Sequence, residues 1–234
     1  MTFHEQLARD TATDRDYLLA APVIRRCLAG EVTRELYVAF LTQAYHHVRH
    51  TVPLLMAVGG RLPDRHRWLQ QAVLHYLEEE TGHDEWILND IEHAGGDRAA
   101  AAASEPAVAT EAMVAYAYDT VMRRNPLGFF GMVHVLEGTS VALALNAADR
   151  IQQALGLPSR AFTYLRSHGE LDKEHVNDLA AILARFAEAE DREAVIRCAR
   201  GIYWLYGQVF HGLDAGVEAR LEATPTSSAL RRTA

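Results

Sequence analysis

Apolar residues recur at steps of three and four along almost the whole chain, and this spacing restricts the fold more than any other feature of the sequence. Residues three or four apart share one face of an α-helix, whereas a half-buried strand alternates at every second residue. Alanine, leucine, glutamate and arginine are abundant and runs of β-branched residues are missing, which also favours helices. The sequence therefore predicts an all-α protein.

Glycines, prolines and a capping threonine divide this pattern into separate helices. Thr33 is a candidate N-cap, Pro53 a candidate kink and Gly156 a candidate stop. No linker or internal repeat divides the chain, so we expect one helical bundle over residues 15–222, between an N-terminal segment (1–14) and a disordered tail (223–234). The expected helices cover about residues 14–28, 34–57, 65–93, 111–124, 126–155, 159 onward and 191–222.

The charge and the cysteine content exclude several classes of function. The formal net charge is −8 and no cluster of lysine or arginine occurs, which argues against a nucleic-acid partner. No apolar run reaches the roughly 18 residues that a membrane span needs, and the polar N-terminus lacks the apolar core of a signal peptide. Two cysteines, Cys27 and Cys198, suit a reducing compartment. We expect a cytoplasmic protein that acts on a small molecule.

Glu137 is an acid on a helical face that is otherwise apolar. Phe130 and Val133 precede it on that face, and Val141 and Ala144 follow. Burial of an unpaired carboxylate is strongly unfavourable, so this residue needs a partner. An arginine, a hydroxyl group or a metal ion could each serve.

Glu80 and His83 are three residues apart, so on a continuous helix they would share a face and could hold one ion. Carboxylate and imidazole at this spacing form the ligand pair of diiron helical bundles. The same pair also arises by chance on helix surfaces, so a surface pair is the alternative interpretation. Glu78, Glu79 and Asp84 are expected to face solvent.

His168, Asp172 and His175 lie at positions i, i+4 and i+7, which is a single stripe along a helix. Two imidazoles and a carboxylate on one stripe are harder to explain as a solvated face than as metal ligands. We therefore expect this stripe to bind metal.

The three groups follow one another in the order that ferritin-like diiron bundles use after their first helix. Those bundles also carry a glutamate on the first helix, but residues 36–56 of this chain contain no acid, and His168 could supply the missing ligand. Three carboxylates and three imidazoles suit two iron ions. The predicted metal ligands are Glu80, His83, Glu137, His168, Asp172 and His175.

Together these motifs resemble the ligand motifs of the heme-oxygenase-like diiron oxidases and oxygenases, and the run from His168 to His175 is the most specific of them. The likeness covers about residues 15–222. The step from Glu80 to His83 is most similar to that of a fatty-acid decarboxylase in the family. The resemblance implies a single-domain, seven-helix heme-oxygenase-like (TenA-like) bundle. It also implies a non-heme diiron enzyme that uses O2 to oxidise a small organic acid or an amino-acid-derived substrate.

The resemblance further implies how the ligands divide between two ions. One iron is expected at the Glu-x-x-His pair and His168, and the other at Asp172 and His175, with Glu137 bridging or near both. A manganese–iron pair would accept the same ligands. An external electron donor and a homodimer are also expected.

Tyr45 and Arg166 are candidate catalytic residues beside Glu137. Tyr45 lies on the helix that would face the metals in place of the missing acid, and Arg166 could hold a substrate carboxylate through two hydrogen bonds. Each could equally be an ordinary surface residue.

Two other functions remain open. A TenA/PqqC-like, metal-independent enzyme could use the acids as general acid and base on a small heterocycle. A metal-binding bundle could also act without any organic substrate. Thiaminases of this fold use a cysteine on the helix that corresponds to the one holding Glu137, and this chain has none there.

Overall fold

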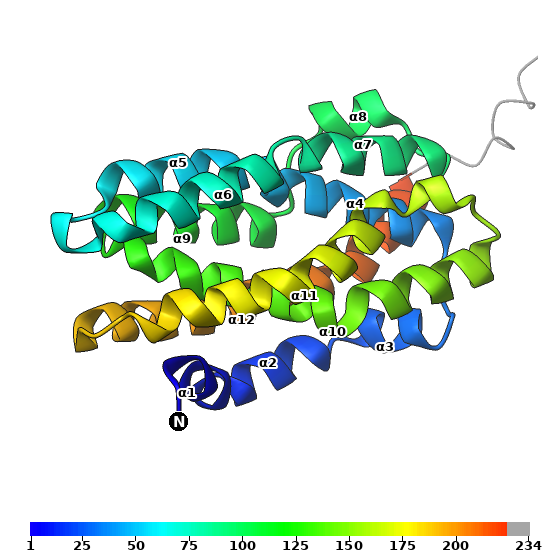
Figure 1. Cartoon of the computed structure of the whole chain (residues 1–234). Coiled ribbons are helices and arrows are strands. Elements are labelled where there is room, and N and C mark those ends of the chain that lie inside the picture. Colours follow the sequence, from blue (N-terminus) through cyan, green and yellow to red (C-terminus); the bar gives the residue numbers. More distant parts are fainter. Residues whose placement is uncertain (224–234) are drawn as a thin grey trace, which may run out of the picture.

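The computed structural model describes the backbone of residues 1–223 and the side chains of residues 1–170 and 175–213. Every regular element in that part of the chain is helical, and the elements pack into one bundle (Figure 1). The expected all-α class is thus confirmed. The expected disordered tail beyond residue 223 lies outside the described residues.

Eight longer helices form the body of the bundle, and four shorter helices and three 3-10 turns connect or cover them. The longer helices are α4 (Arg34–Val48), α5 (Thr51–Arg61), α6 (Gln70–Glu80), α7 (His83–His93), α9 (Val108–Arg123), α10 (Phe129–Leu155), α11 (Thr163–Ala184) and α12 (Ala189–Ala223). The shorter elements are α1 (Phe3–Asp10), α2 (Ala12–Leu19), α3 (Pro22–Leu28), α8 (Arg98–Ala103), η1 (Asp64–Leu69), η2 (Pro126–Gly128) and η3 (Ser159–Ala161).

Several expected helices are divided where proline or glycine changes the backbone. The helix expected over 14–28 is two helices, because Pro22 starts α3 at a position where its missing N–H is tolerated. The helix expected over 34–57 is interrupted between Val48, where α4 ends, and Thr51, where α5 begins. Pro53 therefore lies in the first turn of α5 rather than at a kink within one helix. The helix expected over 65–93 consists of η1, α6 and α7.

The N-terminal segment is also helical and belongs to the core. Thr2 and Glu5 form a reciprocal capping box at the start of α1. Phe3 and Leu7 on that helix are buried in the same apolar cluster as residues of α10 and α12. The expected boundary at residues 14–15 falls inside α2.

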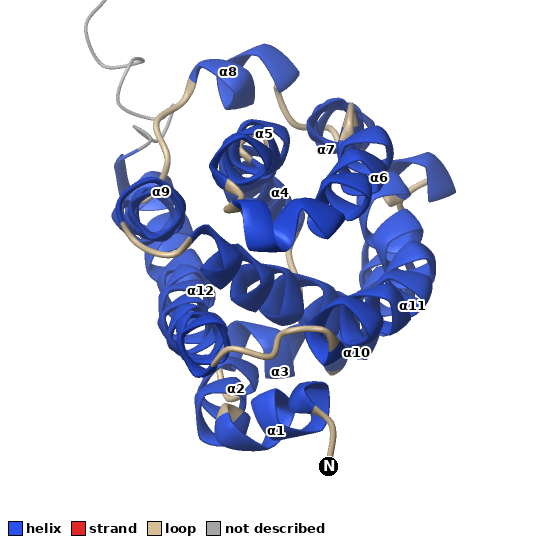
Figure 2. Ribbon diagram, turned by 60° about the vertical axis from the view of Figure 1, so that its left-hand side comes forward, coloured by secondary structure: helices blue, strands red, loops and turns tan. Residues whose placement is uncertain are grey.

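α10 packs along α11 and α12. In the view of Figure 2, α4 and α5 lie between α9 and α12 on one side and α6, α7 and α11 on the other. Gly131 permits the close approach of α10 to α12, because a β-carbon there would overlap the backbone at Val195. Thr33 caps α4 through its side chain, 3.1 Å from the Leu36 N–H, as predicted.

The segment Pro126–Leu155 is long and apolar enough, by length and composition, to cross a membrane. The expectation that no run of this kind exists is therefore wrong, because the few charged residues of this segment do not cancel its apolar character. Its most apolar stretch of 18 residues is 67% buried inside the bundle, so packing in the protein core accounts for the apolar character.

Candidate metal centre

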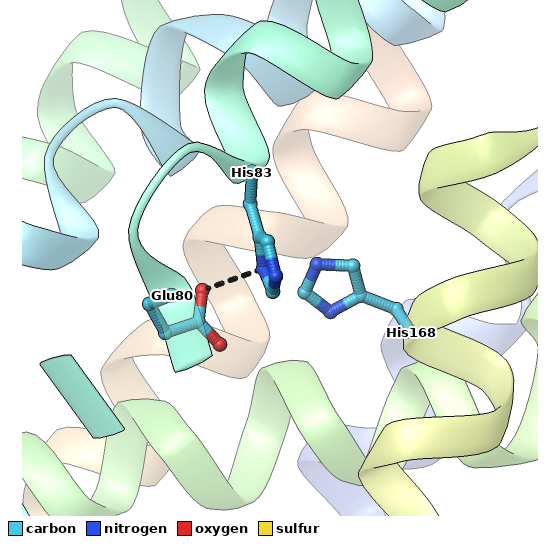
Figure 3. Close-up of side chains that lie close together, drawn as sticks. All are labelled: Glu80, His83 and His168. Atoms are coloured by element: carbon cyan, nitrogen blue, oxygen red, sulfur yellow. Dashed lines mark ion pairs between the residues drawn. The ribbon is translucent and has the colours of Figure 1, made fainter. Parts of the chain in front are cut away.

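Three of the predicted ligands converge between α6, α7 and α11. Ligand atoms of Glu80, His83 and His168 all lie within 4.8 Å of one another. His83 Nδ1 is 3.2 Å from Glu80 Oε2, and the rings of His83 and His168 meet edge to face with centroids 4.8 Å apart (Figure 3). One ion could contact all three side chains after small rotations.

Glu80 and His83 reach this point from two helices rather than from one helical face. α6 ends at Glu80, Thr81 is extended, and Gly82 adopts a left-handed conformation with φ of 93° before α7 starts at His83. Glycine takes this conformation without the steric penalty of a β-carbon. The predicted pair is therefore close in space, but the tight turn produces the proximity, not the helical repeat.

The helix that carries His168 is fixed to the helix that carries His83. Asp90 of α7 is fully buried, and its carboxylate accepts hydrogen bonds from the backbone N–H groups of Thr163 (3.0 Å) and Tyr164 (2.8 Å). These N–H groups belong to the first turn of α11 and have no partner within that helix. Burial raises the pKa of Asp90, and the two backbone hydrogen bonds oppose that rise.

His175 lies beside two carboxylates on different helices. Its Nδ1 is 3.7 Å from Oε1 of Glu137 on α10, and its Nε2 is 2.9 Å from Oε2 of Glu79 on α6. The ring of Tyr76 is also close, with centroids 5.8 Å apart. His175 and Glu137 are both buried. The side chain of Asp172, the remaining predicted ligand, lies outside the described residues.

Glu79 is a site residue that sequence reasoning missed. It was expected to face solvent, but its side chain is only 28% exposed and contacts His175. Glu78, next to it, is exposed as expected. Three consecutive glutamates end α6, and no periodicity in the sequence distinguishes the one that turns toward α11.

The donor atoms of this region fit a metal ion of the iron type. Nδ1 of His83 lies 3.2 Å from a carboxylate oxygen of Glu80, and Oε2 of Glu79 lies 2.9 Å from Nε2 of His175, but neither contact has hydrogen-bond geometry, so these buried atoms lack a hydrogen-bond partner. Buried polar atoms in native proteins normally have a partner, and imidazole with carboxylate is a donor set suited to divalent iron or manganese. The residues present thus fit such an ion without any thiolate.

An apolar cavity of about 160 Å³ opens beside these residues, and Glu80, Glu137 and His168 form part of its wall. Among the described residues that line it there is no lysine or arginine. The rest of the wall is mainly apolar and includes Val23, Ile24, Leu28, Phe40, Phe129, Met132, Leu136, Leu143 and Phe210. The cavity can therefore hold a small, mostly apolar molecule next to the ligand residues.

His47 brings an imidazole to the same cavity from α4, the helix that lacks an acid. Burial, and then the neighbouring His168, lower the pKa of His47 to about 3, so the ring is neutral. Its Nδ1 is buried without a hydrogen-bond partner, as is the hydroxyl of Ser140 in the cavity wall. These two groups add polar contacts, beyond the predicted ligands, to a wall that is mainly apolar.

The two other candidate catalytic residues do not line this cavity. Tyr45 is buried in a second apolar cluster, with the Arg49 guanidinium 5.3 Å from the centre of its ring. Arg166 forms an ion pair with Asp149 at 2.7 Å and a hydrogen bond to Gln152 at 2.9 Å. Its guanidinium therefore contacts side chains of α10 instead of the cavity.

The fold and the cluster define a protein of the heme-oxygenase-like class with buried carboxylate and imidazole groups. A protein of unknown function with a heme oxygenase-like fold from Shewanella denitrificans matches with a TM-score of 0.83 and 26% identity, over 98% of this chain and 97% of that one. A TenA homologue from P. horikoshii matches with a TM-score of 0.76 and 12% identity, over 92% and 100%. Heme oxygenase-1 from Synechocystis, in complex with heme, matches with a TM-score of 0.71 and 13% identity, over 95% of this chain and 96% of that one.

The chain belongs to the family of iron-containing redox enzymes, whose family model matches residues 38–207. No curated protein matches it. The predicted heme-oxygenase-like family and bundle are thus confirmed, and iron and redox chemistry follow as properties of the family. The low identity to the TenA homologue and to heme oxygenase-1 supports the shared fold alone.

Proposed function

We propose that this protein is a non-heme diiron oxidase or oxygenase that uses O2 to oxidise a small organic acid or an amino-acid-derived molecule. The observation that carries the proposal is the convergence of two ligand groups on one region of the bundle. Glu80, His83 and His168 form the first group, and Glu137 and His175 form the second. Glu137 lines the same cavity as Glu80 and His168, which supports a role for it between the two ions.

In this proposal the first ion is held by Glu80, His83 and His168, and the second by His175 and Glu137 together with Asp172. Bound iron would supply the reduction of O2 coupled to substrate oxidation, which no side chain can provide. A manganese–iron pair would use the same residues.

The protein itself contributes a dry space and a fixed orientation. The apolar walls of the cavity exclude water and would contact the non-reacting part of the substrate. His47, as a neutral imidazole, and Ser140 can each exchange a hydrogen bond with a polar group of the substrate. Tyr76 keeps its proton beside Glu137, because burial and that carboxylate raise the pKa of the hydroxyl.

The TenA-like alternative would need a different reactive group. Cys27 lines the cavity, but burial raises the pKa of its thiol to about 11. Cys198 is fully buried on α12, and burial raises its pKa to about 12. Near neutral pH both thiols are protonated and therefore weak nucleophiles. This chemistry favours the diiron proposal over a hydrolase that depends on a cysteine.

The test is the metal content after anaerobic loading with Fe(II), followed by stopped-flow absorbance on mixing with O2. About two irons per chain and a transient visible band are expected for a diiron centre. His168→Ala should reduce the iron content, whereas the control His211→Ala, at an exposed position on α12, should not. Absence of bound iron in the wild type would contradict the proposal and favour the metal-independent alternative.

A further inference from the structure

The two nitrogen atoms of His175 face different carboxylates. Nδ1 is 3.7 Å from Oε1 of Glu137, and Nε2 is 2.9 Å from Oε2 of Glu79. A histidine that binds a metal through one nitrogen usually donates the N–H of the other to a carboxylate or a carbonyl. The two carboxylates around His175 can therefore have different roles.

The surroundings of the two carboxylates show which one faces the metal region. Glu137 is buried and lines the cavity together with Glu80 and His168. Glu79 does not line the cavity, its side chain is 28% exposed, and its Oε2 is also 3.4 Å from the exposed His75. Nδ1 of His175 thus points toward the metal region, and Nε2 points outward.

We propose that Glu79 is the positioning residue for His175, an inference that rests on the proposed function. In this role Glu79 would accept the Nε2–H of His175, so that the proton stays on Nε2 and the lone pair of Nδ1 faces the second ion. The two atoms are 2.9 Å apart, which is close enough for a charge-assisted hydrogen bond, and a small rotation of either side chain would give them the alignment that they lack in this structure. The nearby carboxylate also makes the imidazole a stronger ligand.

This role gives the last turn of α6 two functions. Glu80 points toward His83 and His168, whereas Glu79, one residue earlier, contacts His175, seven residues further along α11 than His168. Adjacent residues on a helix are about 100° apart, so they can serve two positions on a facing helix. One turn of α6 would then fix both ends of the histidine stripe.

The experiment compares Glu79→Ala, Glu79→Gln and the control Glu78→Ala, which removes an exposed carboxylate from the same turn. Anaerobic titration with Co(II), followed by its visible bands, measures the two binding steps separately. We expect Glu79→Ala to weaken the second step about 10- to 100-fold, the usual effect of removing such a partner, and to leave the first step unchanged. Glu79→Gln keeps an acceptor oxygen and should lie within a few-fold of the wild type.

A second measurement reports the proton directly. The ¹⁵N shifts of the His175 ring in the metal-free protein at neutral pH should show the proton on Nε2 in the wild type, and a mixture of tautomers in Glu79→Ala. Wild-type affinity for both ions in Glu79→Ala would overturn the proposal. Equal losses in Glu79→Gln and Glu79→Ala would overturn it too, because they would make Glu79 itself a ligand.

Failure of the proposed function gives a different result. A wild type that binds fewer than two ions would contradict the diiron proposal, while the ¹⁵N shifts of the metal-free protein would still decide whether Glu79 orients His175. An unchanged tautomer in Glu79→Ala would then reject the positioning role by itself.

Discussion

The carboxylate of Asp90 accepts the backbone N–H of Tyr164 at 2.8 Å and so joins two helices that carry candidate ligands. Asp90 lies seven residues after His83 on α7, and Tyr164 lies four residues before His168 on α11. Its second oxygen accepts the N–H of Thr163. A negative charge at this end also interacts favourably with the dipole of α11. The distance between His83 and His168 therefore depends on a residue that belongs to neither ligand group.

Asp90→Ala should lower both stability and metal affinity. Loss of a capping carboxylate costs about 0.5–2 kcal/mol, and α11 becomes free to shift against α7. Urea denaturation of the metal-free protein measures the first effect, and Co(II) titration measures the second. The control Asp97→Ala removes a cap from the exposed start of α8, where the carboxylate is 2.9 Å from the Ala100 N–H. Equal metal affinity in the two variants would contradict this prediction.

His134 should make the protein less stable as the pH falls from about 6.5 to 4. Burial, and then His4 and Arg15, lower its pKa to about 4, whereas an unfolded histidine titrates near 6.5. Between these values the unfolded chain binds more protons, so acidification favours unfolding, by roughly 1–2 kcal/mol at pH 5. His134→Phe keeps an aromatic ring there and removes the titration. The loss of unfolding free energy between pH 7 and pH 5 should be smaller in this variant, and an identical loss would contradict the assignment.

Leu143→Trp should fill the cavity without removing any ligand residue. Leu143 is partly buried in the cavity wall. In the wild type, 1-octanol should raise the melting temperature of the metal-free protein, because a molecule that binds only the folded state stabilises it. The variant should lose this shift and keep the iron content of the wild type. Met122→Trp, at an exposed position of α9, is the control and should retain the shift.

Two glycines of α10 should respond to alanine in opposite directions. A β-carbon at Gly131 would overlap the backbone of α12, so Gly131→Ala should destabilise the protein by at least about 1–3 kcal/mol. A β-carbon at Gly138 meets nothing within 4 Å, so Gly138→Ala should add up to about 1 kcal/mol. Denaturation midpoints of the two variants provide the measurement. Destabilisation by both would show that the space at Gly138 is not free.

Long, uninterrupted patterns were the most predictable part of this molecule. α10 and α12 match their expected ranges closely, because many turns of apolar repeat outweigh local irregularities. The break at Gly82 was not predictable, since a glycine inside a helical pattern does not reveal a positive φ. The two helices around it are therefore separate, although the sequence pattern continues across them.

The candidate site was predictable in its ligand types but less so in its surroundings. The proximity of Glu80, His83 and His168 was predictable from the types and the order of these residues, although the turn at Gly82 that brings the first two together was not. Glu79 was missed because its contact depends on how α6 faces α11, which is a property of the tertiary packing. The same limit applies to Arg166, whose ion pair with Asp149 depends on how α10 and α11 pack.

The turn at Gly82 gives a bound ion a mechanical role as well as a chemical one. Glu80 and His83 end one helix and begin the next, so an ion held by both would close a small ring across the turn. Such a ring would act as a reversible cross-link, comparable to a disulfide between neighbouring residues, and would restrict movement of α6 relative to α7. The angle between these two helices would then report whether the metal is bound.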